Sequence, residues 1–477
     1  MRPWQTIVAT MLLLILGCGD DGGHSSNSFD QYGGWTGVRS QATGRFRVEQ
    51  IDGVWWFITP EGNGMFSAAV TSLRPEGDFS PPINRAPYQD NILARYGSAE
   101  AWATVTEERL RSWNFNTLGA WSRYDLFEDH FPHTVVLGFH DHAPVVPSSS
   151  PGITGRRMRD YFASEFETAA AVEAEKARAC GANPFCIGVF TDNELPWGPG
   201  VIQIGTYVDA YMSLPAGAPG KVALQQFFEE RYGGEIEAFN GTWGLELTRF
   251  EELQDLTSLR SSYRTEAANR REARILFDGR VAERYFRVVH DALRAVAPDV
   301  LILGCRFFST QTATSVIAAA GPYVDVVSVN DYEFPADTID LLFRTIGTIY
   351  GYLFLDGAFA DLGTVNALTG RPVMITEYFY RTERPGIGAL PPGFPTVATQ
   401  AARADAYEHY MDELLSRPYV IGAHWFGYAD QPETGRPDGE NQQIGLVNIE
   451  DDPYVELTER MRDVNGRIYL SRSPAKF

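Results

Sequence analysis

The sequence is short of positive charge. Its 477 residues carry 40 Lys and Arg against 61 Asp and Glu, which gives a net charge of −21, and no basic stripe runs along the chain. A surface that binds nucleic acid needs clustered cations to neutralise phosphates. The composition therefore argues against a nucleic-acid partner, and equally against a substrate rich in sulfate or carboxylate groups.

Cysteine and metal-binding motifs are also scarce. The chain has four Cys, no CxxC pair and no HExxH motif, so a structural zinc site is not expected. The patterns GxxxxGK[ST] and GxSxG are missing as well, which disfavours phosphate-loop chemistry and an esterase. His140-Asp141-His142 lacks the further ligands of a metal site, so we interpret its histidines as local hydrogen-bonding residues and expect no metal and no cofactor.

Apolar and aromatic residues, in contrast, are plentiful. The hydrophobic fraction is 44%, and the chain holds 10 Trp, 22 Tyr and 29 Phe. This supply excludes general disorder and allows one large domain or two to three ordinary ones. Most rings will be core, but exposed rings also stack on the apolar faces of sugars, and composition alone leaves that choice open.

The amino terminus has the pattern of an export signal. The apolar run from Ile7 to Gly17 is too short to cross a bilayer, and no other run is long enough. Leu16-Gly17-Cys18 resembles the lipobox of bacterial lipoproteins, which implies cleavage of residues 1–17 and lipid on Cys18. A simple cleaved signal is the alternative. We expect 18–40 to be a flexible tether, and the protein to be a cell-surface or periplasmic lipoprotein that meets the membrane only through this anchor.

The remaining cysteines divide into a close pair and a single residue. Cys180 and Cys186 are near enough in sequence to form a disulfide in an oxidising compartment, although two buried thiols are the alternative. Cys305 lies in an apolar run and is interpreted as core.

Short strand-like runs alternate with helical patterns along most of the chain. Several runs are almost continuously apolar, as expected of parallel strands covered on both faces. They are Met65–Thr71, Phe115–Ser122, Thr134–His140, Cys186–Glu194, Leu301–Phe307, Val324–Tyr332, Pro372–Tyr378 and Val420–Tyr428. Eight strands alternating with helices predict an α/β fold, a (β/α)8 TIM barrel over 65–470.

Two additions to the barrel are expected. A short β-hairpin with its turn at Asp52-Gly53 is predicted within an N-terminal β extension over 41–64. The long gap between the fourth and fifth strands predicts an insertion on the side of the barrel where the strands end.

Two glutamates follow or end the fourth and seventh predicted strands. Glu194 comes after Asp192-Asn193, and Glu377 lies between Thr376 and Tyr378. Carboxyl groups at these positions face each other across a barrel mouth, and glycoside hydrolysis needs such a pair to protonate the leaving oxygen and to attack or activate water.

These motifs resemble glycoside hydrolase family 50, the β-agarases. The matching segments are Gly53–Phe57, Pro60–Gly62, Asn114–Gly119, Phe190–Gly198, Leu303–Phe307, Arg371–Glu377, Gly422–Phe426, Asp430–Pro432, Asp438–Asn441 and Ile444-Gly445. The resemblance implies that Glu194 is the acid/base and Glu377 the nucleophile of a retaining enzyme. Their carboxyl groups should then stand about 5–5.5 Å apart.

Further residues near the ends of the predicted strands are candidates for binding the sugar. Arg306 and Tyr332 are also expected to contact Glu377, and Asn193 to hold the hydroxyl beside the anomeric carbon. The candidates are Asn193, Trp197, Arg306, Asn330, Tyr332, His424, Trp425, Trp121 and Glu440.

The sequence thus predicts an enzyme that acts on a β-linked galactan, with agarose or neoagaro-oligosaccharides as the leading substrates. Two alternatives remain open at this point. One is a related retaining glycosidase of another β-glycan, and the other is a non-catalytic sugar-binding surface lipoprotein.

Overall fold

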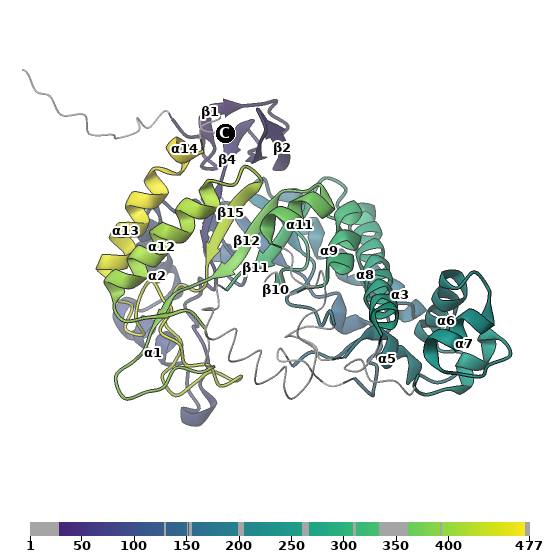
Figure 1. The fold of residues 1–477 in the computed structure, drawn as a ribbon. Helices are drawn as coiled ribbons and strands as arrows, with labels where there is room; N and C mark the ends of the chain where they lie inside the picture. The colour runs from purple at the N-terminus through teal and green to yellow at the C-terminus, as the bar shows by residue number, and fades with distance from the viewer. Residues whose placement is uncertain are drawn as a thin grey trace, which may run out of the picture.

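A parallel sheet forms the centre of the computed structural model, which describes residues 28–127, 130–149, 151, 155–198, 205–259, 267–308, 312–332, 361–391 and 394–472. Its order is β10-β11-β12-β15-β5-β6-β7-β8-β9 (Figure 1). In chain order the strands are β5 (Ser67–Val70), β6 (Thr117–Leu118), β7 (His133–Val136), β8 (Cys186–Phe190), β9 (Leu301–Ile302), β10 (Phe307–Phe308), β11 (Val327–Asn330), β12 (Val373–Tyr378) and β15 (Val420–Trp425).

The two end strands of this order belong to one stretch of chain. β9 pairs with β8, and β10, only a few residues later, pairs with β11. Between them the Leu303 N–H donates to the Val189 carbonyl at 2.8 Å, and the Arg306 N–H donates to Ser328 Oγ at 2.8 Å. β9 and β10 together therefore take the place of one strand, the fifth, and join β8 to β11 so that the sheet closes. The predicted TIM-barrel-like fold is confirmed, with its fifth strand divided into two short pieces.

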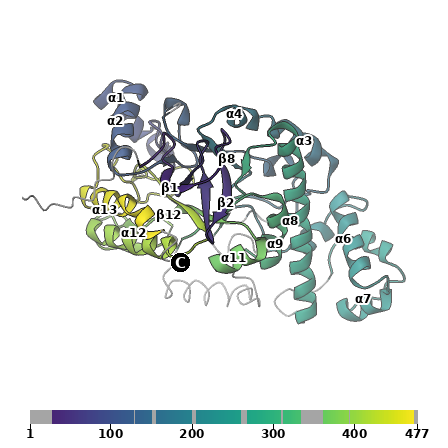
Figure 2. The same ribbon diagram turned by 90° about the horizontal axis from the view of Figure 1, so that it is seen from above.

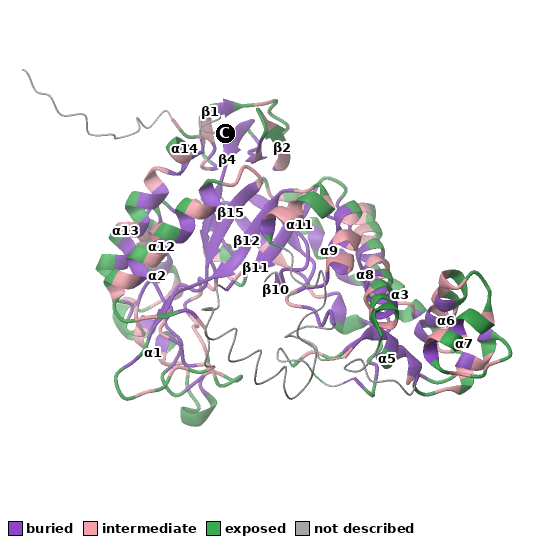
Figure 3. Cartoon of the chain, viewed as in Figure 1, coloured by how far each residue is buried: buried purple, intermediate pink, exposed green. Residues whose placement is uncertain are grey.

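Helices cover the outside of the barrel, as Figure 2 shows from above. They are α1 (Pro87–Tyr96), α2 (Ala99–Ser112), α3 (Ser164–Ala174), α4 (Ala177–Ala182), α8 (Ala268–Val296), α9 (Thr314–Ala320), α11 (Leu362–Thr369), α12 (Gln400–Leu415), α13 (Val455–Gly466) and α14 (Ile468–Ser471). In α8 the residues Phe277, Val281, Tyr285, Val289 and Leu293 recur every four positions and are buried. This stripe packs the helix on α3 and α9 and leaves its other face to solvent (Figure 3).

The N-terminal extension is larger than the predicted hairpin. It is a four-stranded antiparallel sheet, ordered β1 (Trp35–Arg39), β4 (Asn63–Met65), β3 (Val54–Ile58) and β2 (Arg47–Ile51). The predicted turn joins β2 and β3, with φ of 51° at Asp52 and 82° at Gly53, as a tight hairpin requires. β1 corrects the expected tether over 18–40, because it pairs with β4 and the Trp35 ring packs on Tyr469.

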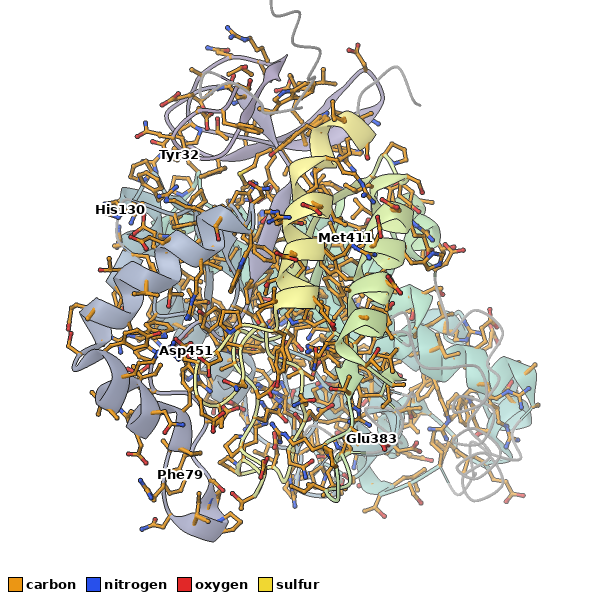
Figure 4. All side chains as sticks on the ribbon, turned by 90° about the vertical axis from the view of Figure 1, so that its left-hand side faces the viewer. Tyr32, Phe79, His130, Glu383, Met411 and Asp451 are labelled. Atoms are coloured by element: carbon orange, nitrogen blue, oxygen red, sulfur yellow. A yellow bond between two sulfur atoms is a disulfide. The ribbon has the colours of Figure 1, made fainter. Side chains whose placement is uncertain are left out.

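This small sheet covers the end of the barrel where the strands begin. Phe46 and Phe57 share one apolar cluster with Ile187, Leu301 and Met374 from the barrel. In Figure 4 Tyr32 lies at this end, whereas Phe79 and Glu383, from loops that follow β5 and β12, lie at the opposite end. The other end, where the strands finish, is therefore where functional side chains can gather.

The predicted insertion after β8 is present. It contains α5 (Tyr207–Met212), α6 (Pro219–Arg231) and α7 (Ile236–Trp243), and it returns to the barrel through α8. In Figure 1 α6 and α7 extend to one side of the barrel.

Cys180 of α4 and Cys186 of β8 form a disulfide with a Cα–Cα distance of 5.2 Å, so the pairing is confirmed over two thiols. Cys305 is a buried free thiol. Cys18 and the predicted signal segment lie outside the described residues. No helix in the described ranges combines the length and the apolar character needed to span a bilayer.

Candidate active site

Glu377 is the last residue but one of β12 and lies almost fully inside the protein, with 4% of its surface exposed. Arg306 Nη2 donates to its Oε1 at 2.7 Å, and the Tyr332 hydroxyl donates to its Oε2. These are the contacts predicted for Arg306 and Tyr332. Burial and the two nearby glutamates raise the pKa of Tyr332 well above its usual range, so it stays a neutral donor. Two donors leave further lone pairs of the carboxylate available.

Glu194 lies beyond β8 and keeps part of its surface exposed. Asn330 Nδ2 donates to its Oε1 at 2.8 Å. Burial, and next the charge of Glu377, raise the pKa of Glu194 to about 7, against the opposing effects of Asn330 and Arg306. The two carboxyl groups therefore interact electrostatically. A substantial fraction of Glu194 is still protonated near pH 7.

The amide of Asn330 contacts two other candidates at once. Besides Glu194, its Nδ2 donates to Asn193 Oδ1 at 3.1 Å. Sugar binding was expected of Asn330, but the structure shows this side chain engaged with the acid and its neighbour.

Trp121 presents the open ring of the site. It follows β6, is 37% exposed, and packs nearly perpendicular to the Phe426 ring, with 6.1 Å between the ring centroids. The Arg306 guanidinium lies 4.1 Å from the centroid of the Trp121 ring and so covers one face of it. The stacking of a sugar predicted for Trp121 is therefore possible only on the face of the ring that Arg306 leaves uncovered.

Two other aromatic candidates lie in the core instead of at the mouth. Trp425 is fully buried, donates from Nε1 to the Ile444 carbonyl at 2.9 Å, and packs on Tyr407 of α12. Trp197 is 4% exposed and packs on both Tyr161 and Tyr285. Stacking of a sugar on either ring was expected and is wrong for this structure, because core side chains already cover both.

His424 lies on the barrel side of the strand that carries Trp425. Its Nε2 is 2.9 Å from Ser67 Oγ. Burial and then the charge of Arg306 lower the pKa of His424 to about 3, so the ring is neutral. The ring is fully buried. The expectation that His424 binds the sugar is therefore wrong for this structure, because the ring is not accessible to it.

Glu440 comes from the loop after β15. It pairs with Arg436 at 2.8 Å and accepts from Gln431 Nε2 at 2.7 Å. Its charge is one of the causes of the raised pKa of Glu194.

Three of the eight non-glycine residues with a left-handed backbone in the described part of the chain belong to the site. Trp121, Glu194 and Arg306 have φ of 61°, 48° and 54°, in the left-handed region. Each costs about 1–2 kcal/mol for a residue other than glycine. Three such residues after β6, after β8 and within the fifth position re-aim side chains toward one place, which is the pattern of a functional site.

Sequence reasoning missed two residues that hold the site together. Thr376 is fully buried and bonds to Asn330, and its signal was a polar residue inside an apolar strand just before Glu377. Asp192 accepts from the Tyr285 hydroxyl of α8 at 2.6 Å and from the His140 N–H at 3.0 Å. Burial raises the pKa of Asp192 to about 7, and its signal was its place beside Asn193 and Glu194.

The histidines of the His140-Asp141-His142 segment contact residues of later segments, and not their immediate neighbours as predicted. His140 Nδ1 is 2.6 Å from the Tyr161 hydroxyl, and His142 Nε2 is 3.1 Å from Glu173. Within the described residues no three His, Cys, Asp or Glu side chains are grouped so that they could hold a metal.

A parallel barrel with a protonatable carboxyl and a paired carboxylate where its strands end is the arrangement of barrel glycosidases. No family model matches the chain. It is 27% identical over 507 residues to β-agarase B and 27% identical over 475 residues to β-agarase A, both of Vibrio sp. (strain JT0107).

These alignments cover 92% and 88% of this chain but 50% and 45% of the relatives, so the chain spans about half the length of the curated relatives it matches. The solved structure of an exo-β-agarase matches with a TM-score of 0.79 and 25% identity, over 94% of this chain and 68% of that one. The agarase AgWH50C matches with a TM-score of 0.76 and 26% identity, over 93% and 68%. The chain is therefore β-agarase-like in sequence and fold, as its motifs suggested.

Proposed function

We propose that this protein is a retaining glycoside hydrolase that cleaves a β-linked galactan, with agarose or neoagaro-oligosaccharides as its substrates. One observation carries the proposal. Glu194, with its pKa raised to about 7, lies within electrostatic range of Glu377, which Arg306 and Tyr332 hold in place. The similarity to proteins named β-agarases supports the substrate.

In the first step the Glu194 carboxyl donates its proton to the glycosidic oxygen, and the departing sugar leaves with that proton. A carboxylate oxygen of Glu377 attacks the anomeric carbon and forms a glycosyl ester. Arg306 and Tyr332 orient the attacking carboxylate, so little reorganisation is needed at the moment of reaction.

The second step uses the same pair with their roles changed. Once Glu377 is an ester its negative charge is gone, and that charge is one cause of the raised pKa of Glu194. The pKa of Glu194 therefore falls, and its carboxylate takes a proton from the water that cleaves the ester. The anomeric configuration is retained because two displacements occur at one carbon.

A neutral or modestly decorated galactan suits the charge of the chain. The net charge is −21, and Arg306 and Arg436 at the mouth are already paired with Glu377 and Glu440. Neither cation is left to hold a sulfate or carboxylate of the substrate.

Export and anchoring through Cys18 are part of the same proposal. The support is the apolar run before Leu16-Gly17-Cys18. Mass spectrometry of the membrane fraction tests it, since a diacyl or triacyl modification on Cys18 is expected, and an unmodified amino terminus would contradict it.

Hydrolysis of a panel of β-galactans and β-glucans tests the activity, with the anomer of the first product read by NMR. We expect cleavage of agarose or its oligosaccharides with β retained. Glu194→Gln should lower kcat by about 10²–10⁴-fold, and Glu377→Gln should abolish turnover while leaving sugar affinity largely intact.

Glu229→Gln, at an exposed position of α6, is the matched control and should keep full activity. Full activity in both site variants would remove the assignment of the pair. Cleavage of another β-glycan alone would indicate the related glycosidase, and binding without any hydrolysis by the natural protein would indicate a sugar-binding lipoprotein.

A further inference from the structure

Thr376 touches the partners of both glutamates. Its hydroxyl donates to Asn330 Oδ1 at 2.8 Å, and Asn330 in turn donates to Glu194. Its backbone carbonyl accepts from Arg306 Nη2 at 3.0 Å, and the same nitrogen donates to Glu377. Thr376 is fully buried, so these contacts are not with substrate.

The hydroxyl favours one orientation of the Asn330 amide, because its nearer acceptor is the amide oxygen. An amide has one oxygen, which accepts, and one NH2 group, which donates. Because the Thr376 hydroxyl occupies the oxygen at 2.8 Å, the NH2 group is directed to Glu194 and Asn193. The alternative acceptor of this hydroxyl, the Val329 carbonyl, is farther away at 3.3 Å.

The direction of that amide matters for the acid. An N–H that donates to a carboxylate stabilises the charged form, whereas an amide oxygen facing the same group favours the protonated form. The contact from Asn330 opposes the burial and the like charge that favour a protonated Glu194.

We propose that Thr376 is a positioning residue, which orients Asn330 to set the protonation of the acid/base Glu194 while its carbonyl steadies the Arg306 that holds Glu377. This inference rests on the proposed function for its catalytic meaning. It adds to that function a connection from one buried residue to both Glu194 and Glu377, through Asn330 and Arg306.

Thr376→Val tests the link, because valine keeps the branched shape and removes the hydroxyl. The amide can then turn its oxygen toward Glu194, so the pKa of Glu194 should rise by about one unit. The high-pH limb of kcat/KM should move up by the same amount. Thr376→Ser, which keeps the hydroxyl, should keep the profile of the natural protein.

A second readout does not need turnover. The infrared band of a protonated carboxyl group that is present in Thr376→Val and absent from Thr376→Val/Glu194→Gln belongs to Glu194. Its pH titration is compared with that of the corresponding band in the natural protein, which is identified in the same way with Glu194→Gln. An upward shift here without hydrolysis of any glycan would refute the proposed function and leave the link intact.

An unchanged titration in Thr376→Val, even with lower activity, would overturn the proposal, as would an equal shift in Thr376→Ser. Should Thr376→Val fail to fold, Asn330→Ala removes the same donor and must also raise the Glu194 titration. No rise in that variant would equally overturn it.

Discussion

At the scale of single residues, the protonation of Glu194 depends on several of its neighbours. Burial and the charge of Glu377 raise its pKa from the ordinary 4.5 to about 7, although Asn330 and Arg306 act in the opposite direction. A carboxyl that is protonated more readily in the folded protein than in the unfolded chain stabilises the fold only while it holds the proton. Above neutral pH, where Glu194 loses its proton, this residue therefore lowers the free energy of unfolding.

This cost gives a stability prediction for Glu194→Gln. The contribution of Glu194 is fully present below about pH 4.5 and is lost as the pH rises through 7. The variant should therefore exceed the natural protein at pH 8 by about 1–3 kcal/mol in free energy of unfolding, and the difference should shrink toward pH 5. Urea unfolding at both pH values measures it, and a difference independent of pH would contradict the reasoning.

At the scale of elements, β15 shows how one strand serves two purposes. Neighbouring residues of a strand point to opposite faces. His424 reaches Ser67 of β5, while Trp425 packs on Tyr407 of α12. The strand thus ties the polar floor of the site to the outer helix layer, and this alternation explains why Trp425 is unavailable to a sugar.

The link between α4 and β8 yields a prediction at the same scale. The Cys180–Cys186 disulfide joins two residues that are six positions apart at the start of β8, whereas Glu194 follows the other end of that strand. Replacing both cysteines by serine should lower the free energy of unfolding by about 2 kcal/mol and leave kcat/KM unchanged. Urea unfolding with parallel assays measures both quantities. Lost activity with unaltered stability would show that the disulfide acts on the site instead.

For the whole molecule, the two ends of the barrel have different tasks. The N-terminal sheet closes the end where the strands begin, and Arg472, which follows α14, packs on it. Arg472 lies 4.9 Å from the centroid of the Trp56 ring and donates to the Trp55 carbonyl at 2.9 Å. The site lies at the other end, with the partly exposed Trp121.

A pair of tryptophan substitutions separates these tasks. Trp56→Ala empties a fully buried position and should cost about 3–5 kcal/mol in free energy of unfolding, with KM unchanged at temperatures where the variant is folded. Trp121→Ala should cost about 1 kcal/mol or less and raise KM for the oligosaccharide. Thermal unfolding and steady-state kinetics on both variants measure the contrast, and an equal loss of stability in the two would refute it.

Much of this architecture could be predicted from the sequence. Each of the eight predicted strand ranges overlaps an observed strand, because continuous apolar runs are a direct consequence of burial on both faces. β1 was missed because Gly, Asp and Ser surround it and its partner β4 is distant in sequence. Trp197 and Trp425 were misplaced because sequence position gives the strand end but not which face a ring packs against.

The sequence by itself determined the barrel, the hairpin turn and the place of Glu194 and Glu377 at two strand ends, because these depend on local periodicity and strand order. Only the tertiary structure decided that Asn330 donates to Glu194 and accepts from Thr376, and that His424 lies out of reach of a sugar. Those outcomes depend on side-chain direction and burial, which arise when strands far apart in the chain close into one ring.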